Sequence, residues 1–268
     1  MFRGPKTSLL DIYRDKERVA EAELCRKKQE RLFASSRIPL PDDAKGLVLQ
    51  KLVELGDNQV VISKFDIDFC RHDLNTLRSS NWLNDEVINF YLQMLSDRSR
   101  KQSRLPSLHV FSSFFYPKLK DRGYDSVRSS TRKIKPSLLQ HVDLILFPIH
   151  LGMHWCMAGI DFRHRTITYY DSLRGNNALC LQLLRSWLEQ ESHDKCGVEF
   201  EFTGWTGLCY KDMPTQKNGY DCGVFSLAVA EHISRDAPLS FSQLDMPYWR
   251  DRISYEIITG KLLACSSD

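Results

Sequence analysis

Three residues of the sequence carry the side chains that a thiol hydrolase needs, and the first of them is Cys222. It directly precedes an apolar segment, Val224 to Ile233, that predicts a buried helix. A cysteine in the first turn of a helix lies near unsatisfied backbone N–H groups and the positive end of the helix dipole, which favour thiolate over thiol. Because a free thiol with a pKa near about 8.5 is only slightly ionised at neutral pH, such a nucleophile also needs a base.

His154 and Asp171 are the candidates for the base and for the group that orients it. His154 precedes a predicted strand, Trp155 to Phe162, and Asp171 follows the next one, Thr166 to Tyr170. In an antiparallel pair these two ends meet, which would bring the carboxylate beside the imidazole. Gln216, six residues before Cys222, could donate its amide to a developing oxyanion.

Each of these residues also has an ordinary structural explanation. A free cysteine is more often a small buried apolar residue than a nucleophile. His154 could be a hydrogen-bonded imidazole of the core or the surface, and Asp171 could be a turn residue at a strand end. The spacing alone therefore supports a catalytic triad only weakly.

The elements that must position these residues predict an α+β fold, because a helical front is followed by clustered strands and then by helices. Asn84 or Asp85 can cap a helix whose apolar residues share one face. The other expected elements are a buried strand over 142–149, a helix over about 177–191, a half-buried strand through Val198, Phe200 and Phe202, and a last helix over about 247–262.

Composition and charge exclude several classes of protein. The 268 residues include 37 basic and 34 acidic side chains, which gives a net charge of +3. So mild a charge indicates neither a histone-like DNA binder nor a polyacidic partner. No signal peptide or bilayer-spanning stretch is recognised, so we expect an intracellular protein with no membrane span. The eight cysteines make no Cys-x-x-Cys pair, and we expect free thiols, no metal and no cofactor.

The chain divides at a proline-containing linker. Residues 1–41 predict a charged N-terminal arm or helix followed by the linker, and residues 42–268 predict one globular domain. A run of charge is usually a solvated surface, although a role of the arm in partner binding or targeting stays open.

Five sequence motifs together strongly resemble the ubiquitin-like-protein-specific, or sentrin-specific, cysteine proteases that process SUMO, the small ubiquitin-like modifier. The motifs are Asn81-Trp82-Leu83-Asn84-Asp85-Glu86, Phe114-Phe115-Tyr116-Pro117-Lys118-Leu119, His154-Trp155, Tyr170-Asp171-Ser172, and the segment from Pro214 to Phe225 around Cys222. They occur in the order of that family, and the resemblance covers about residues 60–263. It implies a papain-like fold, with a central mixed or antiparallel sheet flanked by helices, and identifies residues 42–268 as a SUMO-protease catalytic domain.

The resemblance also implies roles for individual residues. His154 would be the general base, Asp171 would orient it, Cys222 would be the nucleophile, and Gln216 would join the Cys222 backbone N–H in the oxyanion hole. Trp82 and Trp155 would cover a tunnel for the Gly-Gly terminus of SUMO, while Asp85, Phe114 and His150 would contact the body of the modifier. The expected partners are SUMO and SUMO-conjugated proteins, and the protein is expected to be nuclear and monomeric.

Three other functions remain open. The segment from Lys118 to Lys135 holds seven basic and two acidic residues, a charge pattern that a nucleic-acid-binding module would also show. We expect no nucleic acid, because an acidic modifier explains local positive charge equally well. The chain could instead bind SUMO without turnover, or it could cleave another ubiquitin-like modifier.

Overall fold

A computed structural model of the chain describes residues 37–134 and 137–263. Contacts between Cα atoms define one compact unit over Leu40–Ala264. The predicted charged arm lies outside the described residues as far as residue 36. No helix of the described ranges is long and apolar enough to cross a bilayer.

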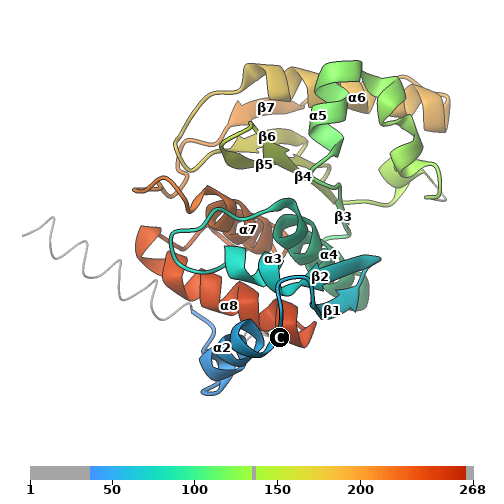
Figure 1. Ribbon diagram of the computed structural model, residues 1–268. Helices are drawn as coiled ribbons and strands as arrows, with labels where there is room; N and C mark the ends of the chain where they lie inside the picture. Colours follow the sequence, from blue (N-terminus) through green and yellow to red (C-terminus); the bar gives the residue numbers. More distant parts are fainter. Residues whose placement is uncertain (1–36, 135–136, 264–268) are drawn as a thin grey trace, which may run out of the picture. The chain divides into compact units, whose positions relative to one another are not determined.

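A five-stranded mixed sheet forms the centre of the compact unit (Figure 1). The strands lie in the order β3-β4-β5-β6-β7, and their bounds are Leu108–Val110, Leu144–His150, Trp155–Asp161, Thr166–Tyr170 and Thr206–Cys209. The three middle strands pair antiparallel, and the two outer strands are each parallel to their neighbour. The predicted α+β fold with a central mixed sheet is therefore confirmed.

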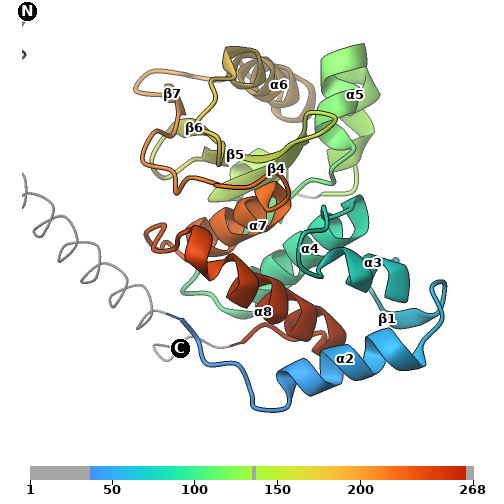
Figure 2. The ribbon, with the colours of Figure 1, turned by 60° about the vertical axis from the view of Figure 1, so that its left-hand side comes forward.

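Helices cover both faces of this sheet (Figure 2). On one face lie α4 (Asp85–Lys101), α7 (Cys222–Ile233) and α8 (Met246–Thr259), and on the other lie α5 (Phe115–Arg122) and α6 (Ala178–Cys196). Each face has its own apolar core because side chains alternate along a strand. In β5, Trp155 and Met157 face the α7 side, and Cys156 and Ala158 face the α6 side.

The helices on the α7 side follow from local sequence signals. Asn84, one of the two cap candidates in the sequence, caps α4 by accepting the Val87 N–H at 3.2 Å. Helix α7 is apolar on nearly every side, and its first eleven residues are all buried. A helix that is apolar all round must lie inside the protein, so the position of Cys222 at its first turn is fixed by packing.

Shorter elements precede and connect these layers. Helix α2 (Ala44–Glu54), the hairpin of β1 (Val60–Lys64) and β2 (Ile67–Cys70), and helix α3 (Arg71–Thr76) come before α4. Four short 3-10 turns lie at Tyr124–Ser126, Arg128–Thr131, Leu138–Gln140 and Gln243–Asp245.

The strand predicted through Val198, Phe200 and Phe202 is wrong. These residues form no strand; Val198 is exposed, and the two phenylalanines join an aromatic cluster with Phe162 and Trp205. The edge position beside β6 is taken instead by β7, whose Gly207 weakens the strand signal in the sequence. The alternation of apolar and acidic residues over 198–202 therefore reflects the packing of an irregular segment on this aromatic cluster.

Candidate active site

The structure brings His154 and Asp171 together at one end of the β5–β6 pair. His154 Nε2 lies 2.7 Å from Asp171 Oδ1. The carboxylate is held by two further donors, since the backbone N–H of Leu173 donates to Oδ1 at 2.8 Å and that of Gly175 donates to Oδ2 at 3.0 Å. Burial alone would raise the pKa of Asp171, but the hydrogen bonds from His154 and the two N–H groups lower it. The carboxylate is therefore ionised and fixed in orientation.

This carboxylate controls the protonation of His154. The hydrogen bond to Asp171 is the largest cause that raises the pKa of His154, followed by hydrogen bonds to Cys156 and Cys222, and together they raise it to about 12. Partial burial of the ring acts in the opposite direction. At neutral pH the imidazole is consequently held as a cation.

Cys222 faces this cation from the first turn of α7. Its side chain is buried, and burial is the largest influence on its pKa and raises it. The hydrogen bond to His154 and backbone hydrogen bonds from Trp155 and Gly223 outweigh burial, so the pKa of Cys222 is lowered. The pair can exist as thiolate and imidazolium, which is the state in which a cysteine attacks a carbonyl carbon.

Two tertiary contacts fix the position of the Cys222 turn. Gly223 lies so close to Leu83 that a Cβ at this glycine would be 2.9 Å from the leucine Cβ. The buried guanidinium of Arg250 on α8 bonds the Asp221 carboxylate at 2.8 Å and 2.9 Å and also donates to the Asn81 carbonyl. The loop before α4 and the turn before α7 are thus tied together through α8.

Gln216 is buried and held between two segments near this turn. Ser172, next to Asp171, donates its hydroxyl to Gln216 Oε1 at 2.9 Å, and Gln216 Nε2 donates to the Asn218 carbonyl at 2.5 Å. A primary amide has two N–H donors, so one remains for another acceptor.

The two predicted tunnel tryptophans lie in neighbouring positions. The Trp155 indole N–H donates to the carbonyl of Leu83 at 3.0 Å, which places the indole beside the residue that follows Trp82. Trp155 is buried and stacks on the His150 ring with centroids 4.2 Å apart, whereas Trp82 is 45% exposed. Gly223, next to Cys222, also packs on Leu83, so the segment that carries Trp82 and the Trp155 indole both adjoin the Cys222 turn.

Asp85 and Phe114 lie on a surface next to the start of α4. Phe114 is 54% exposed, and its neighbour Ser113 is fixed to α4 by two hydrogen bonds with Asn89. A cavity of about 410 Å³ lies here, and Phe114 lines it together with nine other residues, which include Asp66, Asp68 and Glu86. Asp85 adds a further carboxylate at the first residue of the helix.

Sequence reasoning missed several residues of this site, including Cys156, Tyr169 and the pair of Asp221 and Arg250. Cys156 could have been found, because side chains two positions apart on a strand share a face and Cys156 is two residues after His154. The ion pair with Arg250 joins residues 29 positions apart and gives no local signal.

Two groups of described residues bring three metal-ligating atoms within 4.8 Å of one another, namely Cys70, His72 and Asp73, and His154, Cys156 and Asp171. In the second group the histidine and the carboxylate are hydrogen-bonded to each other. The expectation that the protein needs no metal stays a prediction.

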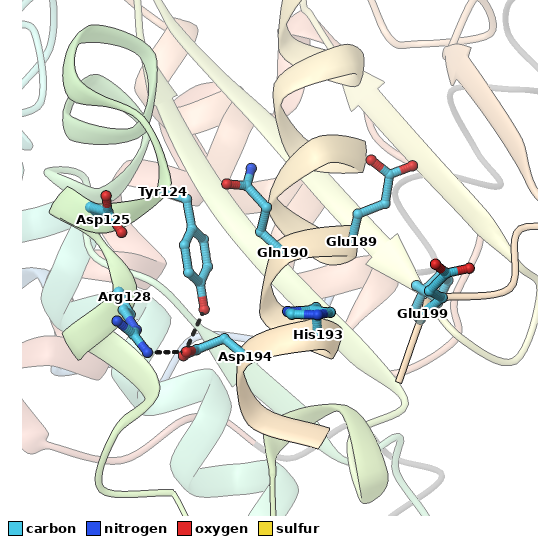
Figure 3. A pocket seen from close by; sticks show the side chains of 9 residues that line it. Tyr124, Asp125, Arg128, Glu189, Gln190, His193, Asp194 and Glu199 are labelled. Atoms are coloured by element: carbon cyan, nitrogen blue, oxygen red, sulfur yellow. Dashed lines mark hydrogen bonds and ion pairs between the residues drawn. The ribbon is translucent and has the colours of Figure 1, made fainter. Parts of the chain in front are cut away.

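A second cavity, of about 700 Å³, lies on the α6 side of the sheet (Figure 3). Four acidic residues line it, together with Arg128, which pairs with Asp194: the acids are Asp125, Glu189, Asp194 and Glu199. Lys195 also pairs with Asp194 at 2.7 Å. Part of the positive charge in the predicted basic segment is therefore neutralised, and the adjoining cavity would repel phosphate groups.

Comparisons with known proteins agree with this arrangement. Residues 81–262 match the Ulp1 protease family, C-terminal catalytic domain. The sentrin-specific protease of Caenorhabditis elegans is 44% identical over 239 residues, which cover 89% of this chain and 34% of the relative. Sentrin-specific protease 2 of Homo sapiens is 36% identical over 241 residues, which cover 89% of this chain and 40% of the relative. The chain thus spans well under half the length of these relatives.

A solved structure is similar over most of the chain. The X-ray structure of the C-terminal Ulp1 protease domain, in complex with Smt3, the yeast ortholog of SUMO, superposes with a TM-score of 0.72 and 32% identity. The match covers 83% of this chain and 96% of that domain.

Proposed function

Because the chain belongs to the Ulp1 protease family, we propose that it is a cysteine protease that hydrolyses the bond after the C-terminal Gly-Gly of SUMO. Both SUMO precursors and SUMO joined to target lysines would be substrates. The observation that carries the proposal is the contact of Cys222 with His154, which is itself bonded to Asp171 at 2.7 Å. This is the set of groups that acyl transfer to a thiol requires.

In the proposed reaction, the Cys222 thiolate attacks the carbonyl carbon of the last glycine. The resulting oxyanion accepts hydrogen bonds from the Cys222 backbone N–H and the free amide N–H of Gln216. His154 then donates its proton to the leaving amine, and the C–N bond breaks to leave a thioester on Cys222. Water attacks the thioester with His154 as the base, which releases the glycine carboxylate and restores the thiolate–imidazolium pair.

The surface around Cys222 supports selection of glycine at the cleavage site. Trp155 and Trp82 would cover the Gly-Gly segment, since two flat indoles leave little room for a side chain. Asp85, Phe114 and His150 would bind the folded body of SUMO away from the reacting bond. Binding energy from this larger surface would hold the short tail in place for attack.

The test is to incubate the protein with SUMO that carries a C-terminal vinyl sulfone and to locate the adduct by peptide mapping. We expect one adduct, at Cys222, and none with Cys222→Ala. An adduct at another cysteine would refute the assignment of the nucleophile.

Matched probes made from ubiquitin and other ubiquitin-like modifiers test the substrate class. Faster labelling by one of these probes would identify that modifier, and not SUMO, as the substrate. Tight binding of SUMO without labelling by its probe, and without cleavage of a SUMO precursor, would indicate a binding module.

A nuclear location is part of the same proposal, supported by the resemblance to the sentrin-specific proteases. Imaging of the chain with a fluorescent tag in cells tests it, and exclusion of the tagged chain from the nucleus would refute it.

A further inference from the structure

Two buried polar side chains that the proposed reaction does not use lie behind the His154–Asp171 pair. Cys156 has no exposed surface and Tyr169 is 2% exposed, and both belong to the core on the α6 side of the sheet. The Tyr169 hydroxyl donates to Cys156 Sγ at 2.9 Å. The sulfur lies within 4.8 Å of ligand atoms of both His154 and Asp171, and its interaction with the imidazole raises the pKa of His154.

The pairing of β5 with β6 explains this cluster. The register sets Met157 opposite Tyr170 and Ala158 opposite Tyr169, and its continuation by one residue sets Cys156 opposite Asp171. Residues two apart on a strand face the same side, so Cys156 shares a face with His154 and Tyr169 shares a face with Asp171. Residues directly opposite on paired strands also face the same side, so all four side chains lie on one face of the sheet. Two adjacent strands therefore supply all four groups.

We propose that Cys156, held in place by Tyr169, is a positioning residue that fixes the His154 ring between Asp171 and Cys222. The inference rests on the proposed function, because it concerns the histidine that would act as the base. A ring held by Asp171 at Nε2 and in contact with Cys222 can still rotate about the line that joins these two contacts. A further contact from a sulfur that is fully buried in the core restricts this rotation.

The chemistry of a thiol suits this position. The ionisable groups around Cys156 are His154, Asp171, Tyr169, Cys180 from α6 and Tyr116 from α5. Burial raises the pKa of the Cys156 thiol, so it stays neutral beside the ionised carboxylate. A neutral thiol is both a weak donor and a weak acceptor, so it can contact His154 before and after the proton is transferred.

The test compares Cys156→Ala, Cys156→Ser and Tyr169→Phe with Cys180→Ala. Cys180 is a matched control because it is also a fully buried cysteine of the same core, and it interacts with Cys156, Tyr116 and Cys209 rather than with His154. Two measurements are made on each variant: kcat and KM for cleavage of a SUMO precursor, and the pH dependence of alkylation at Cys222, followed by peptide mapping.

For Cys156→Ala and Tyr169→Phe we expect kcat to fall by about three- to tenfold at unchanged KM, the effect of one hydrogen bond of ordinary strength. The midpoint of Cys222 alkylation should move to higher pH by about half a pH unit, because an imidazolium that has lost one contact stabilises the thiolate less. Cys156→Ser, which can make the same hydrogen bonds, should stay within about threefold of the wild type.

Equal effects of Cys156→Ala and Cys180→Ala on kcat and on the alkylation midpoint would overturn the inference, as would a serine variant that behaves like alanine. If Cys156→Ala does not fold, Tyr169→Phe decides, and an unchanged midpoint in that variant refutes the positioning role. Alkylation does not depend on SUMO, so a wrong substrate assignment would leave this part of the result intact.

Discussion

Replacement of Gly175 by alanine should strongly slow the proposed cleavage of SUMO although residue 175 carries no catalytic group. A Cβ at this position would lie 2.4 Å from Asp171 Oδ2. An ordinary carbon–oxygen contact is about 3.3–3.6 Å, so the carboxylate must move by about 1 Å. It cannot move freely, because Oδ2 accepts the Gly175 N–H and Oδ1 contacts both the Leu173 N–H and His154.

The size of the effect follows from this displacement. A misplacement of about 1 Å in a catalytic group costs about 100-fold in rate, or about 2.7 kcal/mol in activation free energy. We expect kcat for SUMO cleavage to fall by about that factor while the affinity for SUMO is unchanged. Loss of one hydrogen bond to the buried carboxylate should also lower the free energy of unfolding by about 1–3 kcal/mol.

The assay is steady-state cleavage of a SUMO precursor, with SUMO binding measured on the same variant combined with Cys222→Ala. Gly46→Ala is the control, because a Cβ on Gly46 of α2 meets nothing within 4 Å. A Gly175→Ala enzyme with kcat within about threefold of the wild type would refute the reasoning, since the Asp171 carboxylate would then not need its observed position.

Three further predictions concern the same site. Asp171→Asn should lower kcat/KM by roughly 10³–10⁴-fold. Because Asp171 raises the pKa of His154, its loss should move the alkaline limb of the pH profile to lower pH, and because His154 lowers the pKa of Cys222, the acidic limb should move to higher pH. A pH profile of unchanged width would contradict this. Gly223→Ala should slow cleavage by about tenfold, because its Cβ would lie 2.9 Å from Leu83 Cβ and displace the Cys222 turn, whereas labelling of Cys222 at the wild-type rate would speak against that contact. Arg250→Met should lower the free energy of unfolding in urea by about 3–5 kcal/mol by leaving the Asp221 carboxylate buried without its cation, and the double variant with Asp221→Asn should recover part of the loss; no recovery would disprove the coupling.

The sequence predicted well those features that depend on local periodicity. Strand β6 has the predicted bounds, the cap of α4 is Asn84, one of the two candidates, and Cys222 is the first residue of α7. The meeting of His154 and Asp171 was also predictable, because a short turn between two strands forces an antiparallel pair whose open ends are adjacent.

Features that depend on packing between distant segments were not predictable in this way. The alternating apolar residues at 198–202 meet the strand pattern, yet they pack on Phe162 and Trp205 as an irregular segment. Arg250 lies near the start of a helix that the sequence predicts, but nothing local shows that its guanidinium bonds Asp221 and the Asn81 carbonyl. A buried ion pair is specified only when the whole core is assembled.

The candidate site combines two kinds of precision. The distance between His154 and Asp171 is set by the register of two neighbouring strands, which varies little because a slip of one residue would turn the side chains to the other face. The position of Cys222 is set across the core, by the contact of Gly223 with Leu83 and by Arg250 on α8. The orientation of the base should therefore be robust to substitutions in the helices, whereas the distance from base to nucleophile depends on how closely α4, α7 and α8 pack.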